Sequence, residues 1–326
     1  MNKGRIAIIY SNRAEKSILD PLVDALKTQE LNPIYHDLSK NIDIEDDKNL
    51  SRAYDHIFNF VEEENIEQAV LCGDRREMLF VSLALFLKNV PFSQLAAGDL
   101  SESLATVDDY FRHMITLISQ KQVCFSQLSY QNTKDLLGKL NIKLNASVLP
   151  LSPSLWEAKP SVREIEGEYD LVLMHPQSLS RKKTQEDQQE VSLLIEESLQ
   201  DNQKTVVIIK GNKDKNYDIF YDYWDRLECN KPTTCPYTGN WGKQTGGLQI
   251  YENTKKEKFF SLIKYCSRFI TNSSCSFYEA PSFLTEDQII RIGGRNHGRE
   301  IVKADLNKKI DSRDILSSVL YKTPIK

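Results

Sequence analysis

The chain has 326 residues, of which 40% are hydrophobic and 27% are charged, and its formal net charge at pH 7 is -4. This length and apolar content suffice for a sizeable core and favour two domains over one. The small acidic excess excludes the basic surface that binding to nucleic acid or anionic lipid requires. No apolar run approaches the roughly 20 residues of a membrane span. We therefore expect neither nucleic-acid nor membrane partners.

The first predicted strand begins almost at Met1, so we expect no signal peptide. The six cysteines are scattered without a Cys-x-x-Cys pair, a pattern typical of reduced thiols. Both observations predict a cytoplasmic protein.

Apolar strands alternate with amphipathic helices along the whole chain, which predicts parallel β-α-β units. In the first half the predicted strands are Arg5–Tyr10, Ala69–Cys72, Phe92–Leu95 and Val123–Phe125, and the predicted helices are Ser17–Gln29, Glu77–Leu87, Asp108–Ser119 and Asn132–Leu140. In the second half the predicted strands are Leu171–Met174, Thr205–Ile209, Leu248–Tyr251, Arg268–Ile270 and Ile289–Ile292, and the predicted helices are Glu186–Leu199, Ile219–Leu227, Lys258–Cys266 and Asp311–Tyr321.

The stretch Leu151–Gly167 contains prolines and lacks periodicity, so we interpret it as an interdomain linker. The predicted fold class is α/β, with two Rossmann-like doubly wound domains over residues 1–155 and 156–326. The predicted C-terminal helix, Asp311–Tyr321, could pack back on the first domain. Because doubly wound sheets bind ligands at the carboxyl ends of their strands, we expect the substrate in a cleft between the domains. The loop Asn230–Gly247, rich in Pro, Thr and Gly, is a candidate lid.

A cluster of small hydroxyl residues follows the strand Arg268–Ile270. Asn272, Ser273 and Ser274 lead into a helix-compatible segment that contains Glu279. Unpaired N–H groups at a helix start, the helix dipole and serine hydroxyls together favour an anion. A carboxylate one turn further on suits sugar hydroxyls, so the pair indicates the diphosphate and ribose of a nucleotide. The alternative is a serine-rich helix cap without a ligand.

Acidic residues cluster where strands of the first half end. Asp74 follows the strand that ends at Cys72, after Gly73, and Asp99, Asp108 and Arg112 lie around the next helix start, beside His113. Carboxylates converging on a cleft raise one another's pKa and supply an acid/base pair. The alternatives are an N-cap for Asp74 and a surface ion pair between Asp108 and Arg112, which are four residues apart on one helix face.

Two further polar residues stand at strand ends. Arg13 follows the first strand, where it is either a phosphate clamp or a solvated side chain. His175 ends the strand Leu171–Met174 and is followed by a proline, which places the imidazole at the rim of the sheet. Neither Gly-x-Gly-x-x-Gly nor a Walker motif occurs, which argues against a standard dinucleotide or ATP site.

Taken together, these residues resemble the UDP-N-acetylglucosamine 2-epimerase family, specifically its hydrolysing branch. The matching blocks occur in the family's order and span most of the chain: Asn12–Glu15, Gly73–Met78, Asp108–Thr116, His175–Pro176, Asn272–Phe283 and Gly293–Arg299.

The resemblance implies a GT-B architecture and assigns expected roles. Ser273 and Ser274 would hold the diphosphate and Glu279 the ribose, with Arg13, Asn272 and Arg295 completing the UDP site. The catalytic carboxylates would be Asp74, Asp99 and Asp108, with His175 near the leaving phosphate and Arg112 and His113 also in the cleft. The resemblance implies no NAD, other cofactor or metal. It also allows a homodimer.

This chain departs from the family pattern at Gln94–Asp99, where the family carries His-x-His-Gly-Gly-Glu. The leading hypothesis is a hydrolysing epimerase that converts a UDP-2-acetamido sugar to UDP and the 2-epimeric free sugar, such as N-acetylmannosamine. The alternatives are a non-hydrolysing epimerase, a glycosyltransferase of the same architecture, and a non-catalytic protein that binds UDP sugars.

Overall fold

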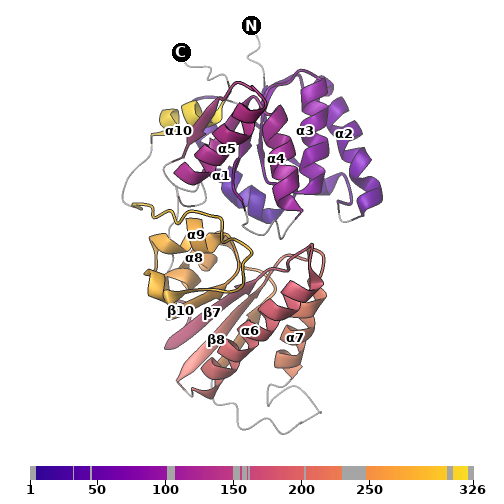
Figure 1. Ribbon diagram of the computed structural model, residues 1–326. Helices are drawn as coiled ribbons and strands as arrows, with labels where there is room; N and C mark the ends of the chain where they lie inside the picture. The colour runs from indigo at the N-terminus through magenta and orange to yellow at the C-terminus, as the bar shows by residue number, and fades with distance from the viewer. Residues whose placement is uncertain are drawn as a thin grey trace. The chain divides into compact units, whose positions relative to one another are not determined.

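The computed structural model describes residues 5–31, 33–44, 46–100, 107–149, 155, 160, 162–201, 203–229, 247–306 and 311–321, with the side chains of Arg13 and Asp47 outside the description. These residues form two compact units. The first lies within residues 1–100, 107–157 and 298–326, and the second within residues 158–297. Figure 1 shows each unit as a sheet covered by helices.

Unit 1 is built on six parallel strands in the order β2-β1-β3-β4-β5-β6. Its elements in chain order are β1 (Arg5–Tyr10), α1 (Arg13–Thr28), β2 (Pro33–Asp37), α2 (Leu50–Glu63), β3 (Ile66–Cys72), α3 (Arg76–Leu87), β4 (Phe92–Leu95), α4 (Asp108–Ile118), β5 (Lys121–Cys124), α5 (Gln127–Lys139), β6 (Ala146–Val148) and α10 (Ser312–Val319).

Both faces of the unit 1 sheet are covered. Helices α2, α3 and α4 pack side by side on one face, where buried residues such as Ile57, Val81 and Ile115 meet the strands. Helix α1 packs with α10 on the opposite face (Figure 1). Three hydrogen bonds hold α10 in place: Gln29 Nε2 donates to Ser312 Oγ over 3.0 Å, Lys121 Nζ donates to the Ser317 carbonyl over 3.0 Å, and Ser147 Oγ donates to the Ser318 carbonyl over 2.5 Å.

Unit 2 is a second parallel sheet, with five strands in the order β11-β10-β7-β8-β9. Its elements are β7 (Glu168–Met174), α6 (Arg181–Gln200), β8 (Lys204–Lys210), α7 (Asp218–Cys229), β9 (Gly247–Tyr251), α8 (Lys256–Tyr265), β10 (Arg268–Thr271), α9 (Cys275–Tyr278) and β11 (Ile289–Arg291). Helices α6 and α7 cover one face and α8 and α9 the other (Figure 1). The predicted doubly wound fold class is confirmed for both units.

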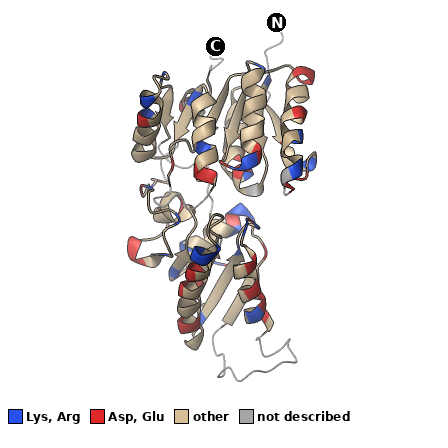
Figure 2. Cartoon of the chain, turned by 45° about the vertical axis from the view of Figure 1, so that its right-hand side comes forward, with Lys and Arg blue, Asp and Glu red and all other residues tan. Residues whose placement is uncertain are grey.

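Charged side chains of both signs are interspersed on the helices, while the strands carry few (Figure 2). This distribution follows from parallel strands being buried on both faces. Within the described residues, every helix is too short or too polar to span a bilayer.

Two parts of the fold differ from expectation. Strand β2 and helix α2 were not predicted, although both are well formed. Conversely, the helix expected around Glu279 is short: α9 ends at Tyr278, and a single 3₁₀ turn over Ala280–Ser282 follows it. Pro281 lacks the N–H that a continuing α-helix needs. The candidate lid Asn230–Gly247 lies outside the described residues, apart from Gly247 at the start of β9.

The packing of α10 predicts that the end of the chain stabilises unit 1. Leu316 is 1% exposed, so Leu316→Ala is expected to lower the free energy of unfolding by about 2–5 kcal/mol. Ile301→Ala, at a side chain that is 44% exposed in the same C-terminal segment, is the control and should change it by less than about 0.5 kcal/mol. Urea unfolding measures both. If Leu316→Ala lowered the free energy of unfolding as little as the control does, α10 would not contribute to this core.

Candidate functional site

Each sheet reverses its strand order beside its first strand, and such reversals are where doubly wound sheets bind ligands. In unit 1 the reversal falls between β1 and β3, which are neighbours. The turns that leave these strands carry Ser11 to Arg13 and Gly73 to Asp74. They are joined directly, because Ser11 Oγ lies 2.7 Å from Glu77 Oε1.

A buried guanidinium gathers the acidic residues of unit 1. The Arg112 side chain is 3% exposed and forms ion pairs with Asp74 and with Asp109, the latter over 2.6 Å. It also donates to the Asp99 carbonyl over 2.9 Å. Arg112 lies on α4 and Asp74 follows β3, so this one cation fixes the turns at the carboxyl ends of two neighbouring strands. Asp74 is the accessible end of the cluster, with a side chain that is 26% exposed. It is therefore an ion-pair partner rather than the N-cap of α3, a position that Arg75 occupies without a side-chain cap hydrogen bond.

Asp99 is buried and held by its own set of partners. Its Oδ1 accepts a hydrogen bond from Ser129 Oγ over 2.5 Å, and its Oδ2 lies 3.5 Å from Arg299 Nη1. The preceding Gly98 adopts φ +75°, and a Cβ there would come within 1.9 Å of the Ser129 carbonyl oxygen. Glycine is required at this turn, because no side chain fits against α5.

The remaining predicted residues of unit 1 lie on or next to the same elements. Asp108 is the first residue of α4, one turn before Arg112. His113 follows Arg112, and burial together with the Arg112 charge lowers the pKa of its imidazole. Arg13 begins α1 at the end of the β1 turn. The structure thus brings Asp74, Asp99 and Arg112 into one network, with Asp108 and His113 on the helix that carries Arg112.

In unit 2 the strand order reverses between β7 and β10, and their carboxyl ends are joined by Asn272. Its side-chain oxygen accepts from the His175 N–H over 2.7 Å, and its Nδ2 donates to the His175 carbonyl over 2.8 Å. The same Nδ2 lies 3.1 Å from Asp187 Oδ2. Both polar groups of the Asn272 side chain are therefore committed to the protein. Its observed role is to position the turn that carries His175.

The serine turn lies immediately after Asn272. Ser273 is buried, and its Oγ accepts weakly from the Cys275 N–H over 3.4 Å. Ser274 is half-buried, and no hydrogen bond from its hydroxyl is found among the described residues. Glu279 is the residue that ends α9 rather than a residue inside a longer helix. Because α9 has a single turn, its dipole is small, and any anion held at this turn would depend on donors from side chains and from the turn itself.

His175 is a neutral imidazole across the physiological range. Burial, and then the positive charge of Arg295, lowers its pKa to about 4. Its Nδ1 faces the Asn212 N–H at 3.4 Å. The charge of Arg295 therefore acts on a neutral imidazole at this rim of the sheet. This pairing suits a leaving group that develops negative charge.

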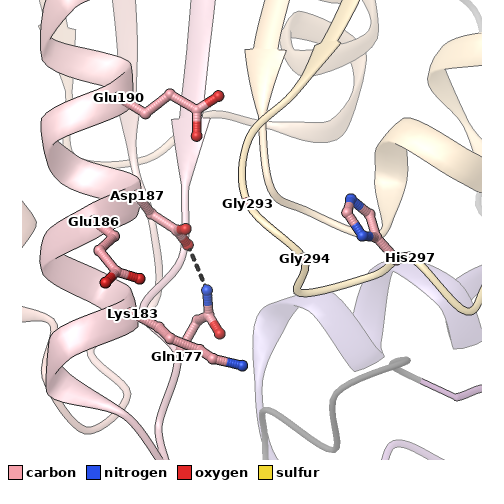
Figure 3. A pocket seen from close by; sticks show the side chains of 8 residues that line it. All are labelled: Gln177, Lys183, Glu186, Asp187, Glu190, Gly293, Gly294 and His297. Carbon is pink, nitrogen blue, oxygen red and sulfur yellow. Dashed lines mark hydrogen bonds between the residues drawn. The ribbon is translucent and has the colours of Figure 1, made fainter.

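Asp187 is a buried residue of unit 2 that the sequence analysis missed. Gln177 Nε2 donates to Asp187 Oδ2 over 2.8 Å (Figure 3), and burial raises the pKa of the carboxyl. A Cβ at Gly293, which has φ +59°, would meet Asp187 Oδ1 at 2.1 Å. The signal was present in the sequence, because Asp187 occupies the apolar face of α6 with Thr184 and Val191.

A cavity of about 320 Å³ lies beside this network, between α6 and the glycine turn (Figure 3). Lys183, Glu186, Asp187 and Glu190 line it on the α6 side. With three carboxyl groups against one ammonium, the cavity is a poor place for a diphosphate. Among the described residues, no group of three or more His, Cys, Asp or Glu is arranged to hold a metal ion.

Two parallel sheets, each with polar residues at the carboxyl ends of its central strands, define the GT-B-like class of α/β proteins. The solved structure of Methanocaldococcus jannaschii UDP-GlcNAc 2-epimerase in complex with UDP-GlcNAc and UDP has this fold. It matches with a TM-score of 0.68 at 12% identity, over 96% of this chain and 98% of that one.

The family model described as UDP-N-acetylglucosamine 2-epimerase matches residues 14–319, so the chain belongs to this family. It is 25% identical over 288 residues to GDP/UDP-N,N'-diacetylbacillosamine 2-epimerase (hydrolyzing) of Campylobacter jejuni, covering 84% of this chain and 70% of that protein. It is 24% identical over 248 residues to the polysialic acid biosynthesis protein P7 of Escherichia coli, covering 74% of this chain and 58% of that protein.

The different burial of the partners of Arg112 predicts unequal costs of mutation. Arg112→Met leaves Asp109, which is 1% exposed, as an uncompensated buried charge, so we expect a loss of about 3–5 kcal/mol in the free energy of unfolding. Asp74→Asn leaves the Arg112–Asp109 pair intact and should cost about 1 kcal/mol. Urea unfolding of both variants is the measurement. Similar costs would mean that Arg112 is not the centre of the cluster.

Proposed function

We propose that the protein is a hydrolysing 2-epimerase that acts on a UDP-2-acetamido sugar and releases UDP and the 2-epimeric free sugar. The observation that carries this proposal is the acidic network on Arg112, which leaves Asp74 as its accessible carboxylate at the strand-order reversal of unit 1. The likeness to the hydrolysing Campylobacter jejuni enzyme favours the UDP-releasing outcome. Candidate substrates are UDP-N-acetylglucosamine and a UDP-2,4-diacetamido trideoxy sugar. The protein is expected to act in the cytoplasm.

The chemistry proceeds in two steps. A carboxylate of unit 1 removes the C2 proton while the C1–O bond to UDP breaks, which yields a glycal and UDP. Water then adds at C1 of the glycal, and a proton returns to C2 on the opposite face. Because the C2–H bond is very weakly acidic, stabilisation of the departing diphosphate must account for much of the rate enhancement. Asp74, Asp99 and Asp108 are the proposed acid and base groups.

Unit 2 is proposed to hold the nucleotide. Ser273 and Ser274 would donate to the diphosphate and Glu279 would accept from the ribose hydroxyls. His175, neutral at pH 7, would donate a hydrogen bond to the leaving phosphate oxygen beside the fixed charge of Arg295. Arg13 would add a further cation to the UDP. The role of Asn272 in this proposal is indirect, through the His175 backbone that it holds.

Product analysis by NMR tests the proposal. Pure protein incubated with either candidate sugar nucleotide, without added NAD or metal, should release UDP together with the free 2-epimeric sugar. Accumulation of the 2-epimeric UDP sugar would identify a non-hydrolysing epimerase. A requirement for an acceptor sugar would identify a glycosyltransferase. Thermal stabilisation by UDP sugars without turnover would identify a binding protein, the alternative that the altered Gln94–Asp99 segment favours.

Asp74 is expected to act in chemistry rather than in binding. Asp74→Asn should lower kcat by about 10²–10⁴-fold, because an amide cannot accept the C2 proton, while the affinity for UDP changes little. The readouts are steady-state kinetics and UDP titration by calorimetry. Asp55→Asn, at an exposed carboxylate on α2, is the control and should match the unmodified enzyme. A variant that loses UDP affinity and keeps its kcat would contradict the assignment.

The homodimer that the resemblance allows has a candidate interface on unit 1. Helix α3 is apolar almost all the way round, which is typical of a helix without a solvent face. Its Leu83, Phe86 and Leu87 are nevertheless exposed, as are Tyr110 and Met114 of the neighbouring α4. Contiguous exposed apolar side chains mark protein contacts. We propose that a second copy of the chain covers this face.

Leu87→Asp is expected to convert the dimer to a monomer, because Leu87 is 60% exposed on this face and an interface aspartate would be desolvated. Light scattering after size exclusion gives the mass. The control is Leu140→Asp, at a leucine that is 55% exposed beyond the end of α5, and it should leave the mass unchanged. A wild-type monomer, or a dimer that survives Leu87→Asp, would exclude this interface.

A further inference from the structure

Three polar residues are buried together beneath the site of unit 1. Ser11 follows β1, Glu15 lies in the first turn of α1, and Glu77 lies in the first turn of α3; their exposed fractions are 2%, 4% and 0%. None of the three carries a role in the proposed chemistry. Two buried carboxyl groups close to each other are costly unless a proton or a cation compensates them.

The short distances from Ser11 Oγ to both carboxyl groups indicate that one of these groups carries a proton. Ser11 Oγ lies 2.9 Å from Glu15 Oε2 and 2.7 Å from Glu77 Oε1, yet a hydroxyl has a single hydrogen to donate. Glu77 Oε1 also accepts from Arg75 Nε over 2.7 Å, which stabilises its negative charge. A neutral Glu15 completes the set, because its O–H donates to Ser11 Oγ while the Ser11 hydroxyl donates to Glu77.

The other oxygen of Glu15 occupies the space that a side chain at position 73 would need. Within the part of the chain that the structure describes, Glu15 Oε1 is buried without a hydrogen-bond partner, and it lies 2.2 Å from the position of a Cβ at Gly73. Gly73 has φ +112°, a conformation that favours glycine. The Ser11 N–H, 2.6 Å from Glu15 Oε2, holds the carboxyl group in this place. Gly73 directly precedes Asp74.

We propose that Glu15 is a positioning residue, protonated at neutral pH, that packs under Gly73 and thereby fixes the backbone from which Asp74 reaches Arg112. Its effect on turnover rests on the proposed function, whereas its protonation and its contact with Gly73 do not.

The groups around Glu15 define the pH range over which its protonation affects stability. Burial, and then the charge of Glu77, raises the pKa of Glu15 from 4.5 to about 8, against the opposing effect of the Ser11 hydrogen bonds and the Arg75 charge. The remaining titratable neighbour is Cys72, whose thiol pKa is raised by burial and by Glu15. Between pH 4.5 and about 8 the folded chain keeps a proton that the unfolded chain has lost. The free energy of unfolding therefore falls as pH rises through this window and levels off above it.

Glu15→Gln tests the protonation. The amide keeps the volume and the donor but does not titrate, so the variant should gain thermal stability relative to wild type as pH rises from about 5 to about 8. For wild type we expect turnover to fall as Glu15 loses its proton above a pH of about 8. Glu15→Gln should lack this fall, with kcat/KM within about threefold of wild type at neutral pH. Asp24→Asn, at an exposed carboxylate on the same helix, should follow wild type in both profiles. If the stability and the turnover of Glu15→Gln depended on pH as those of wild type do, the proposal would be overturned.

A double-mutant cycle with Gly73→Ala and Glu15→Ala tests the contact. The backbone strain of alanine at φ +112° is the same in both backgrounds and cancels in the cycle, whereas the clash with the Glu15 carboxyl is present only in the wild-type background. Gly73→Ala should therefore lower the melting temperature less when Glu15 is already alanine. Additive losses would overturn the contact. If wild type turns over no UDP sugar, the proposed function fails, while the unfolding profiles and this cycle still decide the proposal.

Discussion

The buried guanidinium of Arg112 is the interaction on which unit 1 depends. A charge at 3% exposure is costly in free energy unless it is paired, and Arg112 is paired with Asp109 inside the unit and with Asp74 at its edge. The same group also holds the Asp99 carbonyl. Because Asp74 and Asp99 follow the neighbouring strands β3 and β4, and Asp109 lies on α4 itself, one ion cluster fixes both of these turns against α4.

In unit 2 the corresponding turn is held by side-chain amides rather than by a charged guanidinium. Asn272 and Gln177 bind the buried Asp187, and Asn272 also holds the backbone on both sides of His175. The Asn272 amide is fully used within the protein, so it sets the shape of the turn without competing for a ligand. Under the proposed function, the charge of Arg295 acts on a leaving group beside His175, whose backbone this amide already holds. Preorganised donors of this kind stabilise a developing negative charge without reorganisation.

Much of this organisation is predictable from the sequence. In a parallel sheet the carboxyl ends of neighbouring strands meet at one edge, so residues that directly follow predicted strands, such as Asp74, Asp99 and His175, are expected to lie at the ligand edge. The apolar runs identify those strands, because buried parallel strands are nearly continuous in hydrophobic residues.

Other features depend on tertiary context. Strand β2 is a half-buried edge strand that contains His36 and Asp37, so its local signal is weak. Helix α2 begins without a side-chain cap, but its buried Ala53, Ile57, Phe60 and Val61 recur at helical spacing, a pattern that was available in the sequence. The choice of Asp109, beside Asp108, as the buried partner of Arg112 follows from packing rather than from spacing. The protonation of Glu15 likewise follows from contacts with Ser11 and Glu77, the latter 62 residues away along the chain and brought close by the pairing of β1 with β3.

The central claim is that carboxylates of unit 1 exchange the proton at C2 of a UDP-2-acetamido sugar. Turnover in deuterium oxide tests this most directly, with the released sugar analysed by NMR and mass spectrometry. The account predicts one deuterium, located at C2, in every molecule of the 2-epimeric product. Release of UDP together with a sugar that keeps its original C2 proton and configuration would contradict it, because that outcome is simple hydrolysis without proton exchange.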